Sequence, residues 1–327
     1  MKQECLLSVE NLKTYFFTRA GVVKAVDGVT FSVNAGEALG IAGESGSGKS
    51  ITCLSIVRLV PKPAGRIIAG KILFQGEDIL LKKEKEMKNW RGKIIAMILQ
   101  DPLTSLNPVF TIGNQVGEAF KLEGNRRRKT ITQRVIDILN RVKIPSVERR
   151  LGDYPFQFSG GMRQRVLAAM AIAREPKLLI ADEPTTSLDV TIQHQFLRLL
   201  KEMQRQANMG LILVTHDLGI VAETCDRVAI MYAGRIVETG PVGKVFHQPA
   251  HPYTDALMKA LPKLGRKGKR LYQIEGEPPN LLNLPPGCSF SPRCPKVMDI
   301  CREGCPPMMP VSGDGSAACW LLVKGKV

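Results

Sequence analysis

The residues with the clearest chemical meaning are eight consecutive positions near the N-terminus. They read Gly43-Glu44-Ser45-Gly46-Ser47-Gly48-Lys49-Ser50 and fit the pattern G-x-x-x-x-G-K-S/T. Glycines let the backbone wrap tightly, so that its N–H groups can point at phosphate oxygens. The Lys49 side chain would reach the β- and γ-phosphates of a nucleotide, and the Ser50 hydroxyl would hold Mg²⁺. The eight residues therefore predict a phosphate-binding P-loop.

The residues on either side of this loop have the pattern that a P-loop requires. Residues 38–42 are an apolar run typical of a strand, and residues 50–60 have the apolar spacing of a buried helix that Pro61 ends. The N-terminus of such a helix directs its positive end at the phosphates. A Gly/Ser-rich surface turn is the alternative, but the preceding strand and the following helix favour the P-loop.

Polar residues end three other apolar runs that we predict to be buried strands. Gln100 follows residues 94–99, Asp182 and Glu183 end residues 178–183, and His216 follows residues 211–215. Loops at the carboxyl ends of parallel strands line the sites of α/β proteins. Asp182 would hold Mg²⁺, and Glu183 could accept a proton from an attacking water. Each could also be an ordinary polar strand end, but the P-loop upstream favours the functional interpretation of the two acids.

A second helix start and a basic helical segment lie between these strands. Residues 159–164 place a serine and two glycines at the start of a helix, which predicts either a second anion-binding N-terminus or a simple cap. Residues 130–142 have one apolar helical face, and Thr130 with Gln133 predicts a capping box. We interpret residues 103–158 as a helical subdomain inserted into a core that contains the sheet.

The remaining predicted elements complete a mixed α/β chain. Adjacent aromatics Tyr15, Phe16 and Phe17 could stack on a nucleotide base or pack in the core or a hairpin. The predicted elements are a strand at 6–12, a strand or hairpin at 22–33, hairpins at 65–74 and 228–238, and a helix at 193–206.

Composition limits the class of protein. The chain has 327 residues and a net charge of +16, and it contains no uninterrupted apolar stretch of membrane-spanning length. Glu4 and the absence of an apolar core after it do not fit a signal peptide, so we expect a cytosolic protein. Basic residues cluster at 121–150 and 263–270, which favours a membrane-surface location or a solvated basic face. No nucleic-acid-binding signature accompanies either cluster.

Five of the eight cysteines lie in the last 40 residues: Cys288, Cys294, Cys301, Cys305 and Cys319. Residues 246–327 also hold 12 of the 21 prolines. We therefore expect a loop-rich module that needs a disulfide or a bound metal to stabilise it. Cytosolic thiols are normally reduced, which favours a metal over disulfides. The spacings match neither paired zinc knuckles nor ferredoxin motifs, so zinc and an iron–sulfur cluster stay equally open on spacing alone. Cys5, Cys53 and Cys225 are expected to be buried apolar residues.

Taken together, the motifs resemble those of ABC-transporter ATPases. The P-loop, Gln100, residues 159–164, residues 178–183, residues 187–189 and His216 stand in the order of that family's Walker A loop, Q-loop, signature motif, Walker B strand, D-loop and H-loop. The resemblance implies an α/β fold, namely a P-loop NTPase (RecA-like) core in residues 1–245 with an antiparallel β subdomain and an inserted helical subdomain at about 101–165. It also implies an ATPase that works as one half of a head-to-tail dimer.

The resemblance assigns roles to individual residues of this chain. Glu183 is the implied general base, with Gln100, His216 and Lys49 as further catalytic residues, and Ser50, Gln100 and Asp182 as the Mg²⁺ site. The implied residues that contact a partner's nucleotide are Ser159, Gly160, Gly161, Gln164 and Asp189. The implied nucleotide-binding residues are Tyr15, Phe16, Gly43, Ser45, Gly46, Ser47, Gly48, Lys49, Ser50 and Ile51. Phe16 is the first choice for the adenine-stacking aromatic, and Tyr15 is the second.

Two further segments narrow the resemblance to ATPases of dipeptide and oligopeptide importers. These are residues 100–108 and His251-Pro252-Tyr253-Thr254, together with the cysteine-bearing extension at 246–327. This implies a 4Fe-4S cluster on Cys288, Cys294, Cys301 and Cys319, with Cys305 as a possible substitute ligand and zinc as the alternative metal. It also implies a peripheral protein at the cytoplasmic face of the membrane, where residues 103–116 dock on two permease subunits. The implied partners are a second, different ATPase subunit and, indirectly, an extracytoplasmic peptide-binding protein.

Two other functions are weighed against peptide import. Nickel-importer ATPases share part of the pattern, so a nickel or other solute importer is the alternative. A soluble ABC ATPase of translation or DNA repair is the other, but those chains usually carry two nucleotide domains or a long coiled coil. This chain has one P-loop and no heptad run.

Overall fold

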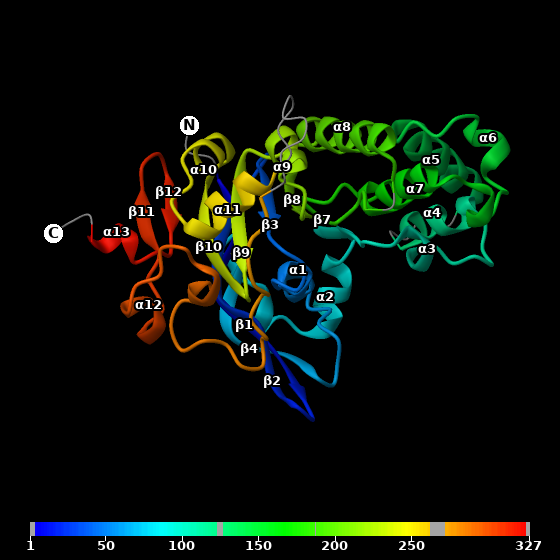
Figure 1. The fold of residues 1–327 in the computed structure, drawn as a ribbon. Coiled ribbons are helices and arrows are strands. Elements are labelled where there is room, and N and C mark those ends of the chain that lie inside the picture. The colour runs from blue at the N-terminus through cyan, green and yellow to red at the C-terminus, as the bar shows by residue number, and fades with distance from the viewer. Residues whose placement is uncertain (1–3, 123–126, 187, 262–271, 325–327) are drawn as a thin grey trace. The chain divides into compact units, whose positions relative to one another are not determined.

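The computed structural model describes residues 4–122, 127–186, 188–261 and 272–324. The chain forms two compact units. The helix-rich unit is mainly Lys82–Leu213, and the P-loop unit combines Leu7–Val33, Ala38–Leu81 and Val214–Val327. Each unit is described by itself (Figure 1). The predicted boundary at residue 245 and the predicted limits of the inserted subdomain stay predictions.

One sheet of the P-loop unit is antiparallel and has the strand order β2-β1-β4-β5. Its strands are β1 (Cys5–Thr18), β2 (Gly21–Asn34), β4 (Gly65–Phe74) and β5 (Glu77–Asp78). The prediction of a hairpin within residues 65–74 is wrong, because β4 is a single strand paired with β1 from Leu7↔Phe74 to Phe16↔Gly65. Gly70 lies at the register shift of this pair with a φ of 102°.

The other strands of this unit lie on one side of the P-loop strand in the second sheet. The strand β3 (Ala38–Ala42) is buried along its whole length and pairs in parallel with β9 (Arg227–Tyr232). The strand β9 forms the predicted hairpin with β10 (Arg235–Pro241), and β12 (Gly315–Ala317) and β11 (Met309–Val311) of the extension continue beyond β10. The helices are α1 (Lys49–Ile56), α9 (Leu218–Thr224), α10 (Val242–His247), α11 (Pro252–Ala260), α12 (Ile300–Glu303) and α13 (Leu321–Lys324), with 3-10 turns η1 (Ile79–Leu81) and η3 (Ser291–Arg293). The short elements after α11 agree with the high proline content of the extension.

The helix-rich unit has parallel strands β6 (Ile95–Ile98) and β7 (Leu178–Asp182), followed in the sheet by β8 (Gly210–Thr215). Between β6 and β7 in the chain come α3 (Pro102–Ser105), α4 (Ile112–Lys121), α5 (Arg128–Arg141), α6 (Val147–Arg150), η2 (Pro155–Gln157) and α7 (Gly160–Ile172) (Figure 1). The unit also contains α2 (Glu84–Trp90) and α8 (Val190–Gln206). The predicted apolar face of α5 is buried, but the predicted capping box at Thr130 is wrong because the helix already starts after Arg127.

Candidate functional site

The P-loop has the backbone that its glycines predict. Gly43, Gly46 and Gly48 have φ values of 154°, 75° and 102°, which other residues rarely adopt. A Cβ at Gly43 would lie 2.1 Å from the Met231 carbonyl oxygen, and one at Gly48 would lie 2.2 Å from that of Ala25. The loop therefore packs so closely against neighbouring backbone that only glycine fits at these two positions.

Lys49 is held in place by the loop itself. Its Nζ donates hydrogen bonds to the carbonyl oxygens of Gly43 at 2.8 Å and Glu44 at 2.9 Å, and the residue is buried. Both acceptors are neutral, so the ammonium charge is oriented without being neutralised by these two contacts. A cation fixed in this way is suited to stabilising phosphate oxygens.

The next side chains of the loop also suit an anion. The Ser47 hydroxyl is buried and has no hydrogen-bond partner among the described residues, which makes it available to a bound group. Ser45 and Gly46 are exposed, and Ser50 and Ile51 are half-buried in the first turn of α1. The N-terminal end of α1 thus presents backbone N–H groups and hydroxyls beside Lys49, as a phosphate site requires.

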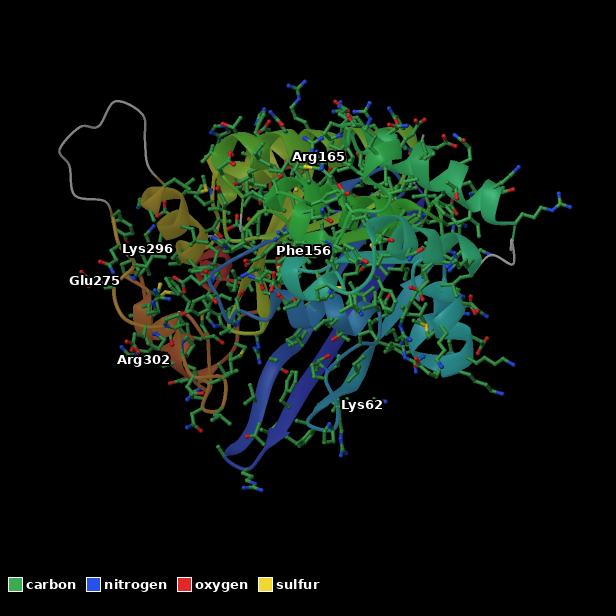
Figure 2. All side chains as sticks on the ribbon, turned by 90° about the vertical axis from the view of Figure 1, so that its right-hand side faces the viewer. Lys62, Phe156, Arg165, Glu275, Lys296 and Arg302 are labelled. Atoms are coloured by element: carbon green, nitrogen blue, oxygen red, sulfur yellow. The ribbon has the colours of Figure 1, made fainter. Side chains whose placement is uncertain are left out.

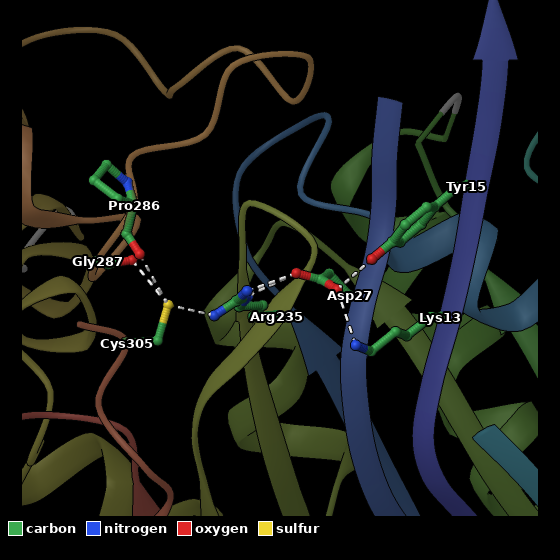
Figure 3. Close-up of polar contacts among 7 residues, drawn as sticks. All are labelled: Lys13, Tyr15, Asp27, Arg235, Pro286, Gly287 and Cys305. Atoms are coloured by element: carbon green, nitrogen blue, oxygen red, sulfur yellow. Dashed lines mark hydrogen bonds and ion pairs between the residues drawn. The ribbon is translucent and has the colours of Figure 1, made fainter. Parts of the chain in front are cut away.

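The two candidate aromatics lie on opposite faces of β1, because successive strand residues alternate. The Tyr15 hydroxyl donates a 2.7 Å hydrogen bond to Asp27, which also binds Arg235 (Figure 3). Thr14, on the other face, hydrogen-bonds Ser55 of α1 at 2.8 Å, and Phe16 shares that face. The pKa of Tyr15 is raised to about 12. Burial is the largest cause, and the hydrogen bond to Asp27 is the next.

In the helix-rich unit the carboxylate of Glu183 is held by two side chains. Gln100 Nε2 donates to its Oε2 at 2.9 Å, and the Thr186 hydroxyl donates to the same oxygen at 3.1 Å. Glu183 follows directly after β7 and has a φ of 43°, a conformation that is costly for a residue with a side chain. The strand end therefore holds this carboxylate in one orientation at a cost in backbone strain.

Asp182 and His216 occupy the predicted strand ends. Asp182 is the last residue of β7 and is buried, whereas Glu183 beside it is half-buried. His216 belongs to the P-loop unit, follows β8 directly and is exposed. Their predicted contacts with Mg²⁺ and the γ-phosphate stay predictions.

Of the signature and D-loop residues, Ser159, Gly160, Gly161 and Asp189 lie at helix starts. Ser159 caps α7 by accepting a hydrogen bond from Met162 N, and Asp189 caps α8 by accepting one from Ile192 N. A Cβ at Gly161 would approach Ile192 to 2.5 Å, whereas one at Gly160 would have room. Gln164 is buried inside the unit, unlike the exposed Ser159, Gly160 and Asp189. Ser187 of the D-loop and the basic cluster at 263–270 lie outside the described residues.

The four cysteines expected to bind metal line one cavity in the extension. Cys288, Cys294, Cys301 and Cys319 surround it with His251, Phe290 and Trp320, and its volume is about 10 Å³. Within the described part of the chain no group of three or more His, Cys, Asp or Glu side chains is arranged to hold a metal ion. The metal-cluster part of the fold prediction is therefore not supported as a preformed centre.

Burial sets the protonation of these thiols. It raises the pKa of Cys288 to about 11 and also raises the pKa values of Cys294 and Cys319 above their usual range. Cys305 lies apart from the cavity: its sulfur accepts from Arg235 Nη1 at 2.7 Å and donates to Gly287 O at 3.0 Å (Figure 3). The four thiols thus share one cavity, but its volume of about 10 Å³ leaves no room for a cluster in this conformation.

Some large apolar side chains of the helix-rich unit are exposed outside its α-helices. Val109 and Phe110 are 71% and 52% exposed, and Phe156 is 69% exposed (Figure 2). The Phe156 ring stacks on Tyr154 at a centroid distance of 5.7 Å. A cleft of about 840 Å³ also lies beside α4 and α5, lined among others by Thr111, Gly117 and Val135. None of the helices in the described ranges has the length and apolar character of a membrane span.

Comparisons with known proteins identify the class to which these features belong. Residues 26–186 match the family model described as ABC transporter, and residues 237–301 match that described as Oligopeptide/dipeptide transporter, C-terminal region. The chain is 48% identical to a protein of Escherichia coli named dipeptide transport ATP-binding protein, over 96% of each chain. It is also 48% identical to one of Sinorhizobium fredii named probable peptide ABC transporter ATP-binding protein, over 98% of this chain and 96% of that protein.

Solved structures agree on the fold. A dimeric ATP-binding cassette in a post-hydrolysis state with ADP and Pi has a TM-score of 0.65 at 24% identity, over 72% of this chain and 99% of that one. A Clostridium perfringens protein, part of an ABC transporter complex, has a TM-score of 0.64 at 28% identity, over 75% of this chain and 92% of that one. The fold is that of an ABC ATPase cassette with a mixed sheet. The chain belongs to the family of ABC transporter ATP-binding proteins and is an ATPase of that class.

Sequence reasoning missed several residues that position the expected ones. Thr186 holds Glu183, and the two threonines that follow the strand-end acids were the available signal. Arg293 and Tyr253 hold Glu44, and no local pattern links them because they lie 249 and 209 residues away along the chain.

Proposed function

We propose that this chain hydrolyses ATP to drive the import of dipeptides or oligopeptides across a membrane. The observation that carries the proposal is that one chain contains both the ABC cassette and the C-terminal region characteristic of oligopeptide/dipeptide transporters. The peptide names of its full-length relatives support the same substrate class.

The P-loop would bind the triphosphate of ATP. Lys49, already oriented by two carbonyl groups, stabilises the charge on the β- and γ-phosphates, and the buried Ser47 hydroxyl is available to donate to a phosphate oxygen. Phe16 shares the α1 face of β1 with Thr14, so it is the better candidate for stacking on the adenine. Tyr15 is committed to Asp27 on the opposite face.

A hard cation fits the remaining oxygen donors. Ser50, Asp182 and the amide oxygen of Gln100 would hold Mg²⁺, because hydroxyl, carboxylate and carbonyl oxygens are the ligands this ion prefers. When bound, the ion neutralises charge on the phosphates. Glu183 then takes the proton of the attacking water, with Gln100 and Thr186 aiming its carboxylate. His216 would contact the γ-phosphate.

The site would be completed by a second ATPase domain. Two helix starts expose Ser159, Gly160 and Asp189. A Cβ at Gly160 would fit without displacing a neighbour, so packing within the unit does not require glycine there. These residues, with Gly161, would contact a partner's nucleotide; the burial of Gln164 argues against a direct contact by its side chain. The isolated chain should therefore bind ATP readily but hydrolyse it slowly. The partner would be a second, different ATPase subunit.

Exposed apolar residues of the helix-rich unit would dock on two membrane-embedded permease subunits. Val109 and Phe110 fall in the predicted docking segment 103–116, and Phe156 adds a third exposed apolar side chain. Such side chains cost little to bury in an interface and are enriched there. The chain would thus lie at the cytoplasmic face of the membrane and respond indirectly to an extracytoplasmic peptide-binding protein.

Reconstitution tests this function. The chain, its partner ATPase and the two permeases would be placed in lipid nanodiscs, and ATP hydrolysis would be measured with the binding protein and a dipeptide. We expect the dipeptide to stimulate hydrolysis several-fold, with a Phe156→Ser variant reducing assembly. Stimulation by nickel salts but not by dipeptides would refute peptide import in favour of a metal importer.

We also propose that the four cavity cysteines bind a 4Fe-4S cluster once the cavity widens and their thiols lose protons. The support is that Cys288, Cys294, Cys301 and Cys319 line one cavity while Cys305 points to Arg235 instead. Because metal binding must displace protons from buried thiols, loading should improve as pH rises. Anaerobic purification followed by iron and zinc assays tests this: stoichiometric zinc without iron would refute the cluster, and a Cys305→Ser control should keep its iron.

A further inference from the structure

The first variable residue of the P-loop, Glu44, is held by the C-terminal extension. We propose that Arg293 and Tyr253 are positioning residues for ATP, which fix Glu44 and thereby Lys49 in the phosphate-binding arrangement. The extension would thus set the affinity of the loop for nucleotide. This inference rests on the proposed role of the P-loop as the ATP site.

Arg293 binds the Glu44 side chain with both ends of its guanidinium. Nη1 donates to Glu44 Oε2 at 2.8 Å, and Nη2 donates to Oε1 at 3.2 Å. The Arg293 side chain is 5% exposed and that of Glu44 is 26% exposed, so the pair is largely shielded from water. Burial alone would lower the pKa of Arg293, but the hydrogen bond to Glu44 raises it. The pKa is therefore above its usual value. A shielded bidentate pair is stronger and more directional than an exposed ion pair.

Tyr253 holds the backbone of the same residue. Its hydroxyl accepts a hydrogen bond from the Glu44 N–H at 3.0 Å. That N–H belongs to the peptide group whose carbonyl oxygen, on Gly43, accepts the 2.8 Å hydrogen bond from Lys49. The Glu44 carbonyl is the second acceptor of Lys49. The two carbonyl groups that aim the lysine therefore flank the residue that the extension fixes.

The extension presents these two side chains from a rigid base. Tyr253, Tyr232 and Phe290 are fully buried and form an aromatic cluster with ring centroids 4.5 to 5.3 Å apart. The N–H of Tyr253 donates to His251 Nδ1, and the N–H of His251 donates to the buried carboxylate of Glu238. Arg293 in turn donates through Nε to Glu275 O and through Nη1 to Tyr232. The contact to Glu44 is thus made by groups that are themselves fixed.

Charge gives the Arg293 contact a role beyond packing. A carboxylate in a phosphate-binding loop repels the triphosphate unless a cation neutralises it, and Arg293 is the cation bound to Glu44. Loss of the arginine would leave both a loosened loop and an uncompensated negative charge. Loss of both members of the pair would leave only the loosened loop.

Equilibrium binding of a fluorescent ATP analogue to the full-length chain tests this. Because a charged hydrogen-bonded pair is lost and the competent loop is less populated, Arg293→Gln should raise the Kd about five- to ten-fold. Tyr253→Phe, which removes one hydroxyl and keeps the ring, should raise it about two- to three-fold. The double variant Glu44→Gln/Arg293→Gln should recover only part of the Arg293→Gln loss, because it removes the uncompensated charge but leaves the loop loosened. In the assembled transporter, Arg293→Gln should raise the KM for ATP more than it lowers kcat.

Matched controls separate this inference from the proposed function. Arg302→Gln removes an exposed arginine from α12 of the same extension and should bind as wild type (Figure 2). Failure of the wild type to bind the analogue, or unchanged binding by Lys49→Ala, would refute the P-loop as the ATP site. If those two behave as expected but Arg293→Gln binds as wild type, or the double variant binds as well as wild type, the positioning role is refuted. Should Arg293→Gln not fold, Tyr253→Phe carries the test, and unchanged binding there overturns the proposal.

Discussion

The P-loop and the strand end at Glu183 are held by different kinds of contact. In the P-loop unit, Lys49 is oriented by two backbone carbonyls of its own loop, and the loop's glycines pack against the backbone of neighbouring strands. In the helix-rich unit, the Glu183 carboxylate is oriented by the side chains of Gln100 and Thr186, and the residue has a strained φ of 43°. The P-loop arrangement depends on the path of the backbone, whereas the arrangement at Glu183 depends on side chains that a substitution can remove.

This difference has a functional consequence. A backbone-built site can bind one ligand group repeatedly without changing, which suits a loop that receives phosphate. A carboxylate held by two side chains from separate segments can be released or aimed when one of those segments moves. Gln100 directly precedes the segment predicted to dock on the permeases, so we expect the hydrolytic step, rather than ATP binding, to respond to transport.

The largest effects should come from removing the two central groups. Glu183→Gln keeps the hydrogen-bonding shape but cannot take a proton, so hydrolysis should fall at least about 100-fold while ATP binding persists. Lys49→Ala should instead abolish detectable binding, because it removes the oriented cation. Steady-state hydrolysis by the assembled transporter and equilibrium binding by the isolated chain measure the two. Undiminished hydrolysis by Glu183→Gln would contradict its role as general base, and Glu183→Asp serves as the matched acid control.

A smaller loss of hydrolysis is expected when Glu183 keeps its charge but loses one of its hydrogen-bond donors. Thr186→Val removes one hydrogen bond of about 1.4 kcal/mol and should lower kcat about ten-fold with little change in the Kd for ATP. Gln100→Ala should lower it further, because Gln100 is also a candidate Mg²⁺ ligand. Thr186→Ser, which retains the hydroxyl, should restore most of the activity. Equal losses in the Ser and Val variants would show that the hydroxyl does not aim the carboxylate.

The adenine contact should change only affinity. Phe16→Ala is expected to weaken ATP binding about ten-fold, since stacking on a base contributes about 1–3 kcal/mol. Tyr15→Phe keeps an aromatic ring on the opposite face and should leave ATP affinity unchanged. Isothermal titration with ATP and with inorganic triphosphate separates the contributions, because only ATP can report the stacking. The reverse ranking of the two variants would assign the adenine contact to Tyr15.

The sequence predicts those parts of the site whose residues are close together along the chain, and it does not predict contacts between residues that are far apart in sequence. The P-loop was predictable because eight consecutive residues fix both the turn and the ligands. The strands that end at Asp182 and Thr215 were predictable because they are continuous apolar runs. Glu44 gave no sign of its partners, because Arg293 and Tyr253 approach it only after the extension folds.

Two errors have local physical causes. Residues 65–74 were predicted to form a hairpin, but β1 is long enough to pair along the whole of β4, and Gly70 takes up a register shift. Thr130 with Gln133 suggested a helix start, but the helix begins at Arg128, before the first residue of its buried apolar face. For the cysteines, the spacing indicated neither which thiols share a cavity nor that Cys305 lies outside it.

The smallest functional effect should come from the Asp27 network, which supports β1 and β2 away from the α1 face (Figure 3). Burial alone would raise the pKa of Asp27, but hydrogen bonds from Tyr15 and Arg235 and the charges of Arg235 and Lys13 lower it below its usual value. The carboxylate therefore contributes stability at neutral pH that is lost as pH falls below the usual aspartate range.

Asp27→Asn should cost about 2 kcal/mol of unfolding free energy at pH 7, because it weakens a buried charged contact to Arg235. The cost should shrink as pH falls below the usual aspartate range, since the wild type then loses the same charge. Lys13→Met is the matched control, because its nitrogen lies 3.9 Å from Asp27 and its loss should change stability by less than about 0.5 kcal/mol. Urea unfolding at pH 7 and near pH 3.5 measures both, and ATP affinity at pH 7 should stay within two-fold of the wild type. If Asp27→Asn weakens ATP binding as much as Phe16→Ala does, the two faces of β1 are not functionally separate, and the backbone of the P-loop unit is less rigid than its contacts indicate.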